Sequence, residues 1–211
     1  MSVDFSKFLG TVDHSVTSLE RDGKPAYAVT LTRAYRTTIK DLWDALTNPE
    51  RLPRWFLPVE GTFQQGGQYQ LTGNACGTIT LCEPPDRLEL TWEFGGSVSW
   101  VEVRLSDEGV DGTRLTLSHI AHPDDHWNTF GPGAAGIGWD MALLGLSLHL
   151  DNPSATVDEE EFATSPEGRS FIRTGGTAWA EAHEKSGAEP SHARELAQRT
   201  TAFYLGETDT D

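Results

Sequence analysis

Apolar and polar residues alternate along much of the first 120 residues, and this alternation predicts an antiparallel sheet with one buried face. Leu88, Leu90 and Trp92, for example, share one side of a strand whose other side carries Glu89 and Thr91. Short turns rich in glycine, asparagine and aspartate separate the segments, so we expect neighbouring strands to form hairpins. The strand pattern is present in seven segments: 11–20, 26–35, 66–73, 75–83, 84–94, 97–107 and 112–120.

A helical spacing interrupts the strands after the second of them. Apolar residues recur every three or four positions between 38 and 47, where Thr38 is a suitable N-cap and Asn48, followed by a proline, is a suitable stop. The next residues, NPERLPRWFLP, place a Trp and a Phe between prolines. We expect a second short helix over 49–56 that ends at Pro58.

The last third of the chain predicts helices. A glycine-rich hinge at 131–138 precedes a helix over 139–150, which is apolar nearly all round and therefore needs cover on both sides. An acidic linker over 151–162 follows, and two amphipathic helices are expected at 165–187 and 189–206. These helices are expected to cover the outer face of the 139–150 helix, in the same chain or in a second subunit.

Composition and charge exclude several functions. The net charge of −16, from 32 acidic and 16 basic residues, makes a nucleic-acid partner a poor fit. No apolar run reaches the roughly 18 to 20 residues that span a bilayer, and residues 1–10 lack a signal-peptide pattern. Cys76 and Cys82 would lie about 20 Å apart on one strand, beyond disulfide reach. Two free thiols indicate a cytoplasmic location.

Four segments, in order, carry a resemblance to a known family: LTRAYRTTIKDLWDALTNPERLPRWF, GTITLCEPPDRLELTWEF, GTRLTLSHIA and GWDMALLGLSLHL. Over residues 25–150 the chain resembles the SRPBCC superfamily, the Bet v 1-like helix-grip fold, and within it the branch of the C-terminal domain of the Hsp90 ATPase activator. The resemblance implies an α+β fold in which a curved antiparallel sheet wraps round a long C-terminal helix. We therefore expect a domain over 1–150 and a helical extension over 151–211.

The resemblance also implies a cavity between the sheet and the C-terminal helix. Strand alternation directs every second side chain of the sheet inward, toward the helix over 139–150. The two short helices after the second strand would close one end of the cavity. Their aromatic residues would either line the cavity or fill the core. The ligand-binding candidates are Trp43, Trp55, Phe56, Tyr69, Leu71, Trp92, Phe94, His119, Trp139 and Met141. Trp92 would need a hydrogen-bond partner for its indole N–H when buried.

His119 is the only catalytic candidate. An imidazole on the inward face could contact a ligand or act as an acid or base, but a buried histidine satisfied by its surroundings is the favoured interpretation. The segment HIAHPDDHWN (119–128) contains metal-ligating residue types without a spacing that brings three together, so we expect a solvated turn and no metal. No nucleophile elbow, P-loop or dinucleotide motif is present, and no cofactor is expected.

Two functions remain open. The first is binding of an apolar or amphipathic small molecule in the cavity, with cyclase-like chemistry as an extension of it, so the sequence does not decide whether the protein is an enzyme. The alternative is a co-chaperone-like interaction module with a chaperone partner and no small-molecule substrate. The helical extension allows a homodimer in either case.

Overall fold

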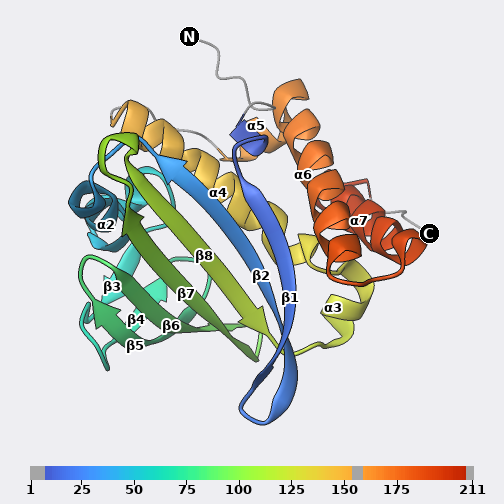
Figure 1. The fold of residues 1–211 in the computed structure, drawn as a ribbon, viewed down its shortest axis with the longest axis horizontal. Coiled ribbons are helices and arrows are strands. Elements are labelled where there is room, and N and C mark those ends of the chain that lie inside the picture. The colour runs from blue at the N-terminus through green and yellow to red at the C-terminus, as the bar shows by residue number, and fades with distance from the viewer. Residues whose placement is uncertain (1–7, 154–158, 208–211) are drawn as a thin grey trace. The chain divides into compact units, whose positions relative to one another are not determined.

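The predicted helix-grip architecture is confirmed by a computed structural model, which describes residues 8–153 and 159–207 (Figure 1). An antiparallel sheet is combined with long helices toward the C-terminus. The strands are β1 (Asp13–Arg21), β2 (Lys24–Tyr35), β3 (Val59–Gly61), β4 (Gln68–Leu71), β5 (Cys76–Glu83), β6 (Arg87–Phe94), β7 (Ser97–Asp107) and β8 (Thr113–Ala121). The helices are α2 (Ile39–Thr47), α3 (Asp125–Phe130), α4 (Gly133–Asp151), α5 (Glu159–Thr164), α6 (Pro166–Lys185) and α7 (Pro190–Tyr204), with 3-10 turns at η1 (Leu52–Arg54) and η2 (Gly109–Asp111).

The sheet has eight strands in the order β1-β2-β8-β7-β6-β5-β4-β3. Its central strands pair in a continuous register, in which Leu90 of β6 lies opposite Val101 of β7, and Val101 lies opposite His119 of β8. Paired residues of an antiparallel ladder share a face, so these three side chains lie on one side of the sheet. Strands β4 to β8 follow one another as in the predicted meander, whereas the edge strand β3 is one that the sequence pattern does not predict.

The chain forms two compact units, each of which is described by itself. The sheet unit lies within residues 32–121 and 142–156, and the hairpin–helix unit lies within residues 1–31, 122–141 and 157–211. Strand β2 and helix α4 each contribute residues to both units. The expected division into residues 1–150 and 151–211 stays a prediction.

Local signals in the first half of the chain are confirmed. The Thr38 side chain accepts a hydrogen bond from the Asp41 N–H and caps α2, and Asn48 is the C-cap. Asp22 and Gly23 adopt positive φ angles of 51° and 72° between β1 and β2, as a tight type I′ hairpin requires. The helix expected over 49–56 is instead the single 3-10 turn η1.

The glycine-rich segment 131–138 is not the hinge that the sequence predicts. Helix α4 begins at Gly133 and continues to Asp151. A Cβ atom on Gly136 would lie 2.2 Å from the Trp179 ring, and one on Gly138 would lie 3.1 Å from the Tyr204 hydroxyl. These glycines therefore allow α6 and α7 to approach α4 closely within the hairpin–helix unit.

The extension is helical, with one helix more than expected. Ser165 caps α6 by accepting a hydrogen bond from the Gly168 N–H, and α6 continues to Lys185. Helix α5 begins at Glu159, inside the segment predicted as an acidic linker. Residues 154–158 of that linker lie outside the described residues. Helix α3 likewise occupies part of the segment predicted as a solvated turn.

Candidate functional site

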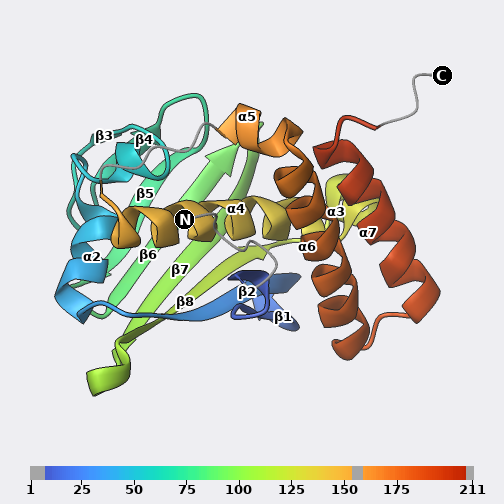
Figure 2. The same cartoon turned by 90° about the horizontal axis from the view of Figure 1, so that it is seen from above.

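An apolar surface on the inner face of the sheet unit contains four of the ten candidate residues. Tyr69, Leu71 and Ile79 are buried at its centre. The partly buried residues that pack against them are Phe56, Leu57, Val59, Cys82, Leu88, Leu90 and Trp92. We call these ten residues the inner apolar surface. Figure 2 shows α4, whose residues 142–151 belong to the same unit, lying across the strands.

Strand β6 is unusually accessible for its position. It lies between β5 and β7, yet none of its eight residues is buried, and Leu88, Leu90 and Trp92 remain half-buried on the inner face. The neighbouring β7 residues Val101 and Val103 on that face are buried. The side chains of this part of the sheet unit therefore leave apolar area of β6 uncovered.

A β-bulge changes which residues of β5 face inward. The pairing with β6 shifts between Ile79 and Leu81, so that Leu81 lies opposite Glu89 and Cys82 lies opposite Leu88. A bulge adds one residue to one strand and reverses the facing of the residues after it. Strand alternation alone places Leu81 inward and Cys82 outward, and this expectation is wrong for both residues.

The aromatic pair after α2 lies against the inner apolar surface. Trp55 and Phe56 stack with ring centroids 5.5 Å apart, and Phe56 is a member of the surface. The indole N–H of Trp55 donates to the Ala45 carbonyl over 3.0 Å. A Cβ atom on Gly145 would lie 2.6 Å from the Trp55 carbonyl oxygen, so this glycine lets α4 pass close to the pair.

A cluster of charged residues around Arg51 fixes the segment that contains Trp55 and Phe56. Arg51 Nη1 donates to Asp41 Oδ1 and to Asp44 Oδ2, both over 2.9 Å. Arg51 Nε donates to Nε2 of His149, a buried residue of α4, over 3.3 Å. Burial, followed by the charge of Arg51, lowers the pKa of His149, so the uncharged ring is the form that accepts this bond. Arg51 thus joins α2, η1 and the end of α4.

His119 belongs to a short hydrogen-bonded chain at the edge of the apolar surface. The Ser99 hydroxyl donates to the Trp92 carbonyl over 3.1 Å, and His119 Nε2 lies 2.8 Å from the same hydroxyl oxygen. A hydroxyl has one proton to donate, so His119 Nε2 carries the proton of the second bond. The Trp92 and His119 ring centroids are 6.0 Å apart.

Burial sets the protonation state of His119. It lowers the pKa of the imidazole to about 4. At pH 7 the ring is therefore neutral, with roughly one molecule in a thousand protonated. A neutral imidazole bonded to a serine hydroxyl can hydrogen-bond a polar group, whereas it is a weak base and supplies almost no acid at neutral pH.

The remaining candidates lie elsewhere. Trp43 is half-buried on α2, and Phe94, next to the β6–β7 turn, is 57% exposed. Trp139 and Met141 are half-buried residues of the hairpin–helix unit. The structure thus gathers Phe56, Tyr69, Leu71 and Trp92 into one surface, with Trp55 and His119 in contact with its members.

Ser99 is the polar residue that the sequence analysis missed. It lies opposite Trp92 in the ladder and on the same face as Val101. The period of two along β7 contains this signal, because Ser99, Val101 and Val103 are alternate residues. From the sequence alone, a serine before two valines in such a series is interpreted as the polar end of the strand. Only the pairing with Trp92 shows that it faces inward.

Within residues 8–153 and 159–207, no group of three or more His, Cys, Asp or Glu side chains is arranged to hold a metal ion. The histidine-rich segment after β8 has structural roles instead. His122 Nδ1 lies 2.8 Å from the Pro25 carbonyl oxygen, and Asp124 caps α3 by accepting from the Trp127 N–H. Among the described helices, none has the length and apolar character required to cross a membrane.

Comparisons with known proteins agree with this geometry. The family model "Activator of Hsp90 ATPase homolog 1-like protein" matches residues 36–151, more than half of the chain. None of the curated proteins compared with the chain matches it. Among solved structures, CalU16 from Micromonospora echinospora is similar in a crystal structure (32% identity, 82% of this chain, 98% of CalU16, TM-score 0.68) and in a solution structure (31%, 83%, 97%, 0.72).

Two more distant structures share the fold. EF2215 from Enterococcus faecalis is 17% identical, with 87% of this chain and 96% of that chain covered and a TM-score of 0.62. PFC0360w, an HSP90 activator from Plasmodium falciparum, is 22% identical, with 59% and 94% covered and a TM-score of 0.50. The likeness to CalU16 covers more of the chain than the family match does. The sequence resemblance is confirmed: the chain belongs to the family of Activator of Hsp90 ATPase homolog 1-like proteins, which has the SRPBCC-type fold.

Proposed function

We propose that the sheet unit binds an apolar or amphipathic small molecule against the inner apolar surface. The observation that carries this proposal is the half-buried inner face of β6 beside buried neighbours on β7. Covering Leu88, Leu90 and Trp92 would remove apolar area from water, which stabilises a complex by about 25 cal/mol for each Å². Pockets for small molecules combine such apolar area with a few polar groups.

His119 and Ser99 are the polar groups that would orient the ligand. They lie beside Trp92 at one edge of the surface, so a ligand with a single polar end fits better than a uniformly apolar one. The low pKa of His119 favours a hydrogen-bonding role over proton transfer. Binding is therefore the function that we propose, and acid–base turnover by His119 near pH 7 is not.

The two cysteines provide a test with its own control. Cys82 belongs to the inner apolar surface, whereas Cys76 lies opposite Glu93 on the other face of the sheet. Native mass spectrometry with organic extraction would first identify any molecule that copurifies with the protein. N-ethylmaleimide labelling of each cysteine would then be followed by peptide mass spectrometry, with and without that molecule or 1-dodecanol as a probe.

We expect bound ligand to slow the labelling of Cys82 at least fivefold and to leave Cys76 unchanged. A Leu90→Asp variant places a charge on the inner apolar surface and should abolish the protection. Equal labelling rates of Cys82 with and without ligand, together with a mass spectrum free of copurified molecules, would contradict the proposal.

A protein partner is the second candidate function. Phe94 and Val98 flank the β6–β7 turn and are 57% and 51% exposed, so this turn offers apolar area to another protein. The structural likeness to an HSP90 activator makes a chaperone a reasonable partner, and the two free cysteines suit the predicted cytoplasmic location. A Phe94→Ser, Val98→Ser double variant that no longer stimulates Hsp90 ATPase activity, beside a stimulating wild type, would support this function. A wild type without effect on the ATPase rate would remove it.

A further inference from the structure

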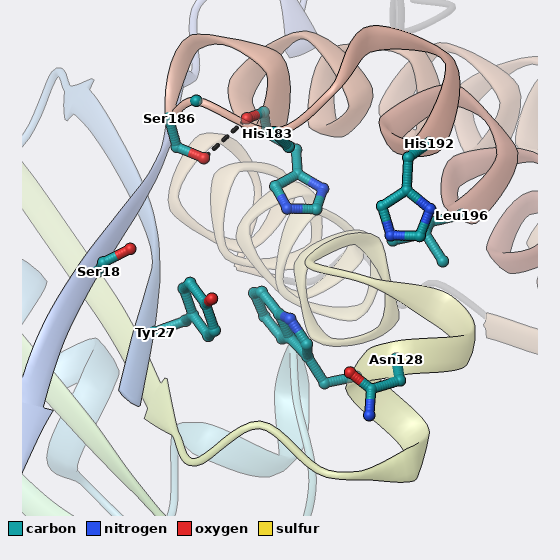
Figure 3. Close-up of a pocket in the computed structure, with 10 residues that line it drawn as sticks. Ser18, Tyr27, Asn128, His183, Ser186, His192 and Leu196 are labelled. Atoms are coloured by element: carbon teal, nitrogen blue, oxygen red, sulfur yellow. Dashed lines mark hydrogen bonds between the residues drawn. The ribbon is translucent and has the colours of Figure 1, made fainter. Parts of the chain in front are cut away.

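The hairpin–helix unit contains a surface cavity of about 360 Å³ that is open to solvent on one side and shares no residue with the inner apolar surface. Three parts of the chain, far apart in sequence, form its walls. The lining residues are Ser18 on β1, Tyr27 on β2, Trp127 and Asn128 on α3, His183 on α6, Ser186, Gly187 and Ala188 in the following loop, and His192 and Leu196 on α7. Figure 3 shows the side chains of Tyr27, His183 and His192 directed toward one space.

Two stacked aromatic rings form one wall. The Tyr27 and Trp127 rings are 4.5 Å apart and inclined by only 7°, and the Trp127 ring meets the His183 ring edge-on at 6.0 Å. Helix α3 holds Trp127 in place because Asp124 caps its first turn. The wall is therefore aromatic, and aromatic rings pack well against a further ring in an offset-stacked or edge-to-face arrangement.

His183 has hydrogen-bonding capacity that the protein does not use. The residue is 8% exposed, and its buried Nδ1 has no hydrogen-bond partner among the described residues. Burial, followed by the nearby His192, lowers the pKa of His183, so its ring is neutral at pH 7. A buried polar atom without a partner is unfavourable, and because His183 lines the cavity, a rotation of its ring would let a polar ligand group supply that partner.

The cavity selects against charged ligands. None of its ten lining residues is Asp, Glu, Lys or Arg. The first turn of α7, which would otherwise attract an anion, is capped by Glu189, whose carboxylate accepts from the His192 N–H over 2.9 Å. At the C-terminal end of α6, the Ser186 N–H donates to backbone carbonyl oxygens, including that of Ala182. Fewer unpaired carbonyl oxygens therefore remain there to bind a cation.

We propose that this cavity binds a neutral, planar aromatic or heteroaromatic molecule with a hydroxyl or amide group directed at His183. An apolar cavity of about 150 Å³ holds one benzene, so 360 Å³ has room for roughly two fused rings with a substituent. The aromatic wall favours a planar ligand, His183 favours a polar substituent, and the uncharged lining favours a neutral one.

The test measures binding of 2-naphthol to the full chain by calorimetry. Ser18, an exposed residue that lines the open side of the cavity, is replaced in Ser18→Trp so that the indole blocks the cavity, whereas Thr17→Trp places the same side chain on the opposite face of β1. We expect wild type and Thr17→Trp to bind 2-naphthol with equal affinity and Ser18→Trp to bind at least tenfold more weakly. Absence of wild-type binding at millimolar 2-naphthol, or an equal loss in both variants, would overturn the proposal.

Two further comparisons test the chemistry of the ligand. His183→Leu should weaken 2-naphthol at least fivefold and leave naphthalene unchanged, since only the hydroxyl uses the imidazole. A merely structural role of His183 predicts equal losses for both probes and would overturn the assignment. Tighter binding of 2-naphthoate than of 2-naphthol would refute the neutral class. The cavity shares no residue with the inner apolar surface, so this experiment and the cysteine labelling fail independently.

Discussion

A single hydroxyl, that of Ser99, determines which ring nitrogen of neutral His119 carries the proton. Because the Ser99 proton is donated to the Trp92 carbonyl, the serine oxygen is left to accept the proton on His119 Nε2. The imidazolium would keep the same Nε2–H bond to Ser99, but burial makes its charge unfavourable and lowers the pKa. His119 is therefore adapted to being neutral.

This arrangement predicts a loss of stability in mild acid. The pKa of His119 falls from 6.5 in the unfolded chain to about 4 in the folded protein, so below pH 6.5 the unfolded chain binds the proton that the folded protein does not. The stabilisation by neutral His119 is complete above pH 6.5 and declines as the pH falls toward 4, by up to about 3 kcal/mol. Urea unfolding of wild type and His119→Gln at pH 7.5, 5.5 and 4.5 measures the difference.

The His119→Gln variant should be the less sensitive of the two to acid, since the titrating carboxylates are common to both proteins. A nuclear magnetic resonance titration of the His119 ring gives the pKa directly. Parallel stability curves, or a pKa near 6.5 for His119 in the folded protein, would show that burial does not hold the ring neutral.

Among the elements, α4 and α6 depend on glycine at their contact. Gly136 faces the ring of Trp179, which is fully buried and donates to Asp140 Oδ2 over 2.9 Å. The other oxygen of that carboxylate lies 2.8 Å from His14 Nε2. Asp140, itself fully buried, thereby joins α4 to α6 and to β1.

Two glycine-to-alanine substitutions in these helices should have opposite signs. In Gly136→Ala the new methyl would overlap the Trp179 ring, and we expect a loss of about 2 kcal/mol or more because overpacking outweighs the helix propensity of alanine. In Gly175→Ala the nearest atom lies 3.5 Å away, so the higher propensity should stabilise by about 0.5–1 kcal/mol. Guanidinium unfolding followed by circular dichroism measures both, and equal effects would contradict the close-packing argument.

These glycines show where sequence reasoning reaches its limit. Strand alternation and capping signals correctly predict the consecutive strands β4 to β8 and helix α2, because their information lies within a few neighbouring residues. The segment 131–138 reads as a hinge since glycine lowers helix propensity, yet contact with Trp179, more than 40 residues away, favours glycine in a helix. The β5 bulge, which turns Cys82 inward, likewise depends on pairing with β6.

The candidate surface could be predicted only in part for the same reason. Period-two alternation places Tyr69, Leu71 and Trp92 on one face, and they meet in the inner apolar surface. The same rule gives Phe94 an inward facing, but it cannot show that the strand ends there and leaves the ring exposed. The cavity of the hairpin–helix unit combines parts of β1, α3 and α7, and no local pattern links these segments.

At the scale of the molecule, the C-terminal helices complete the cover of the first half of α4. Thr200 of α7 donates to the Phe130 carbonyl, and Tyr204 donates to the Ala134 carbonyl over 2.8 Å. Together with the contact of Gly136 with Trp179, these bonds place α6 and α7 against residues 130–140. The sequence analysis expects the extension over the outer face of residues 139–150, whereas these contacts are to residues 130–136, within or next to the segment predicted as a hinge.

Removal of residues 154–211 should therefore expose the first half of α4. Buried Ile137, and Gly136 and Gly138 beside it, would lose the side chains that pack against them. The truncated chains could then bury this exposed apolar area only by associating with one another. We expect the chain 1–153 to form oligomers or aggregates in light scattering. A synthetic peptide of residues 159–207, added during refolding, should restore a soluble 1:1 complex, whereas the same peptide with Trp179→Ala should not. A chain 1–153 that stays monomeric without the peptide would show that α4 needs no cover from the extension, and the close packing at Gly136 would then be dispensable for solubility.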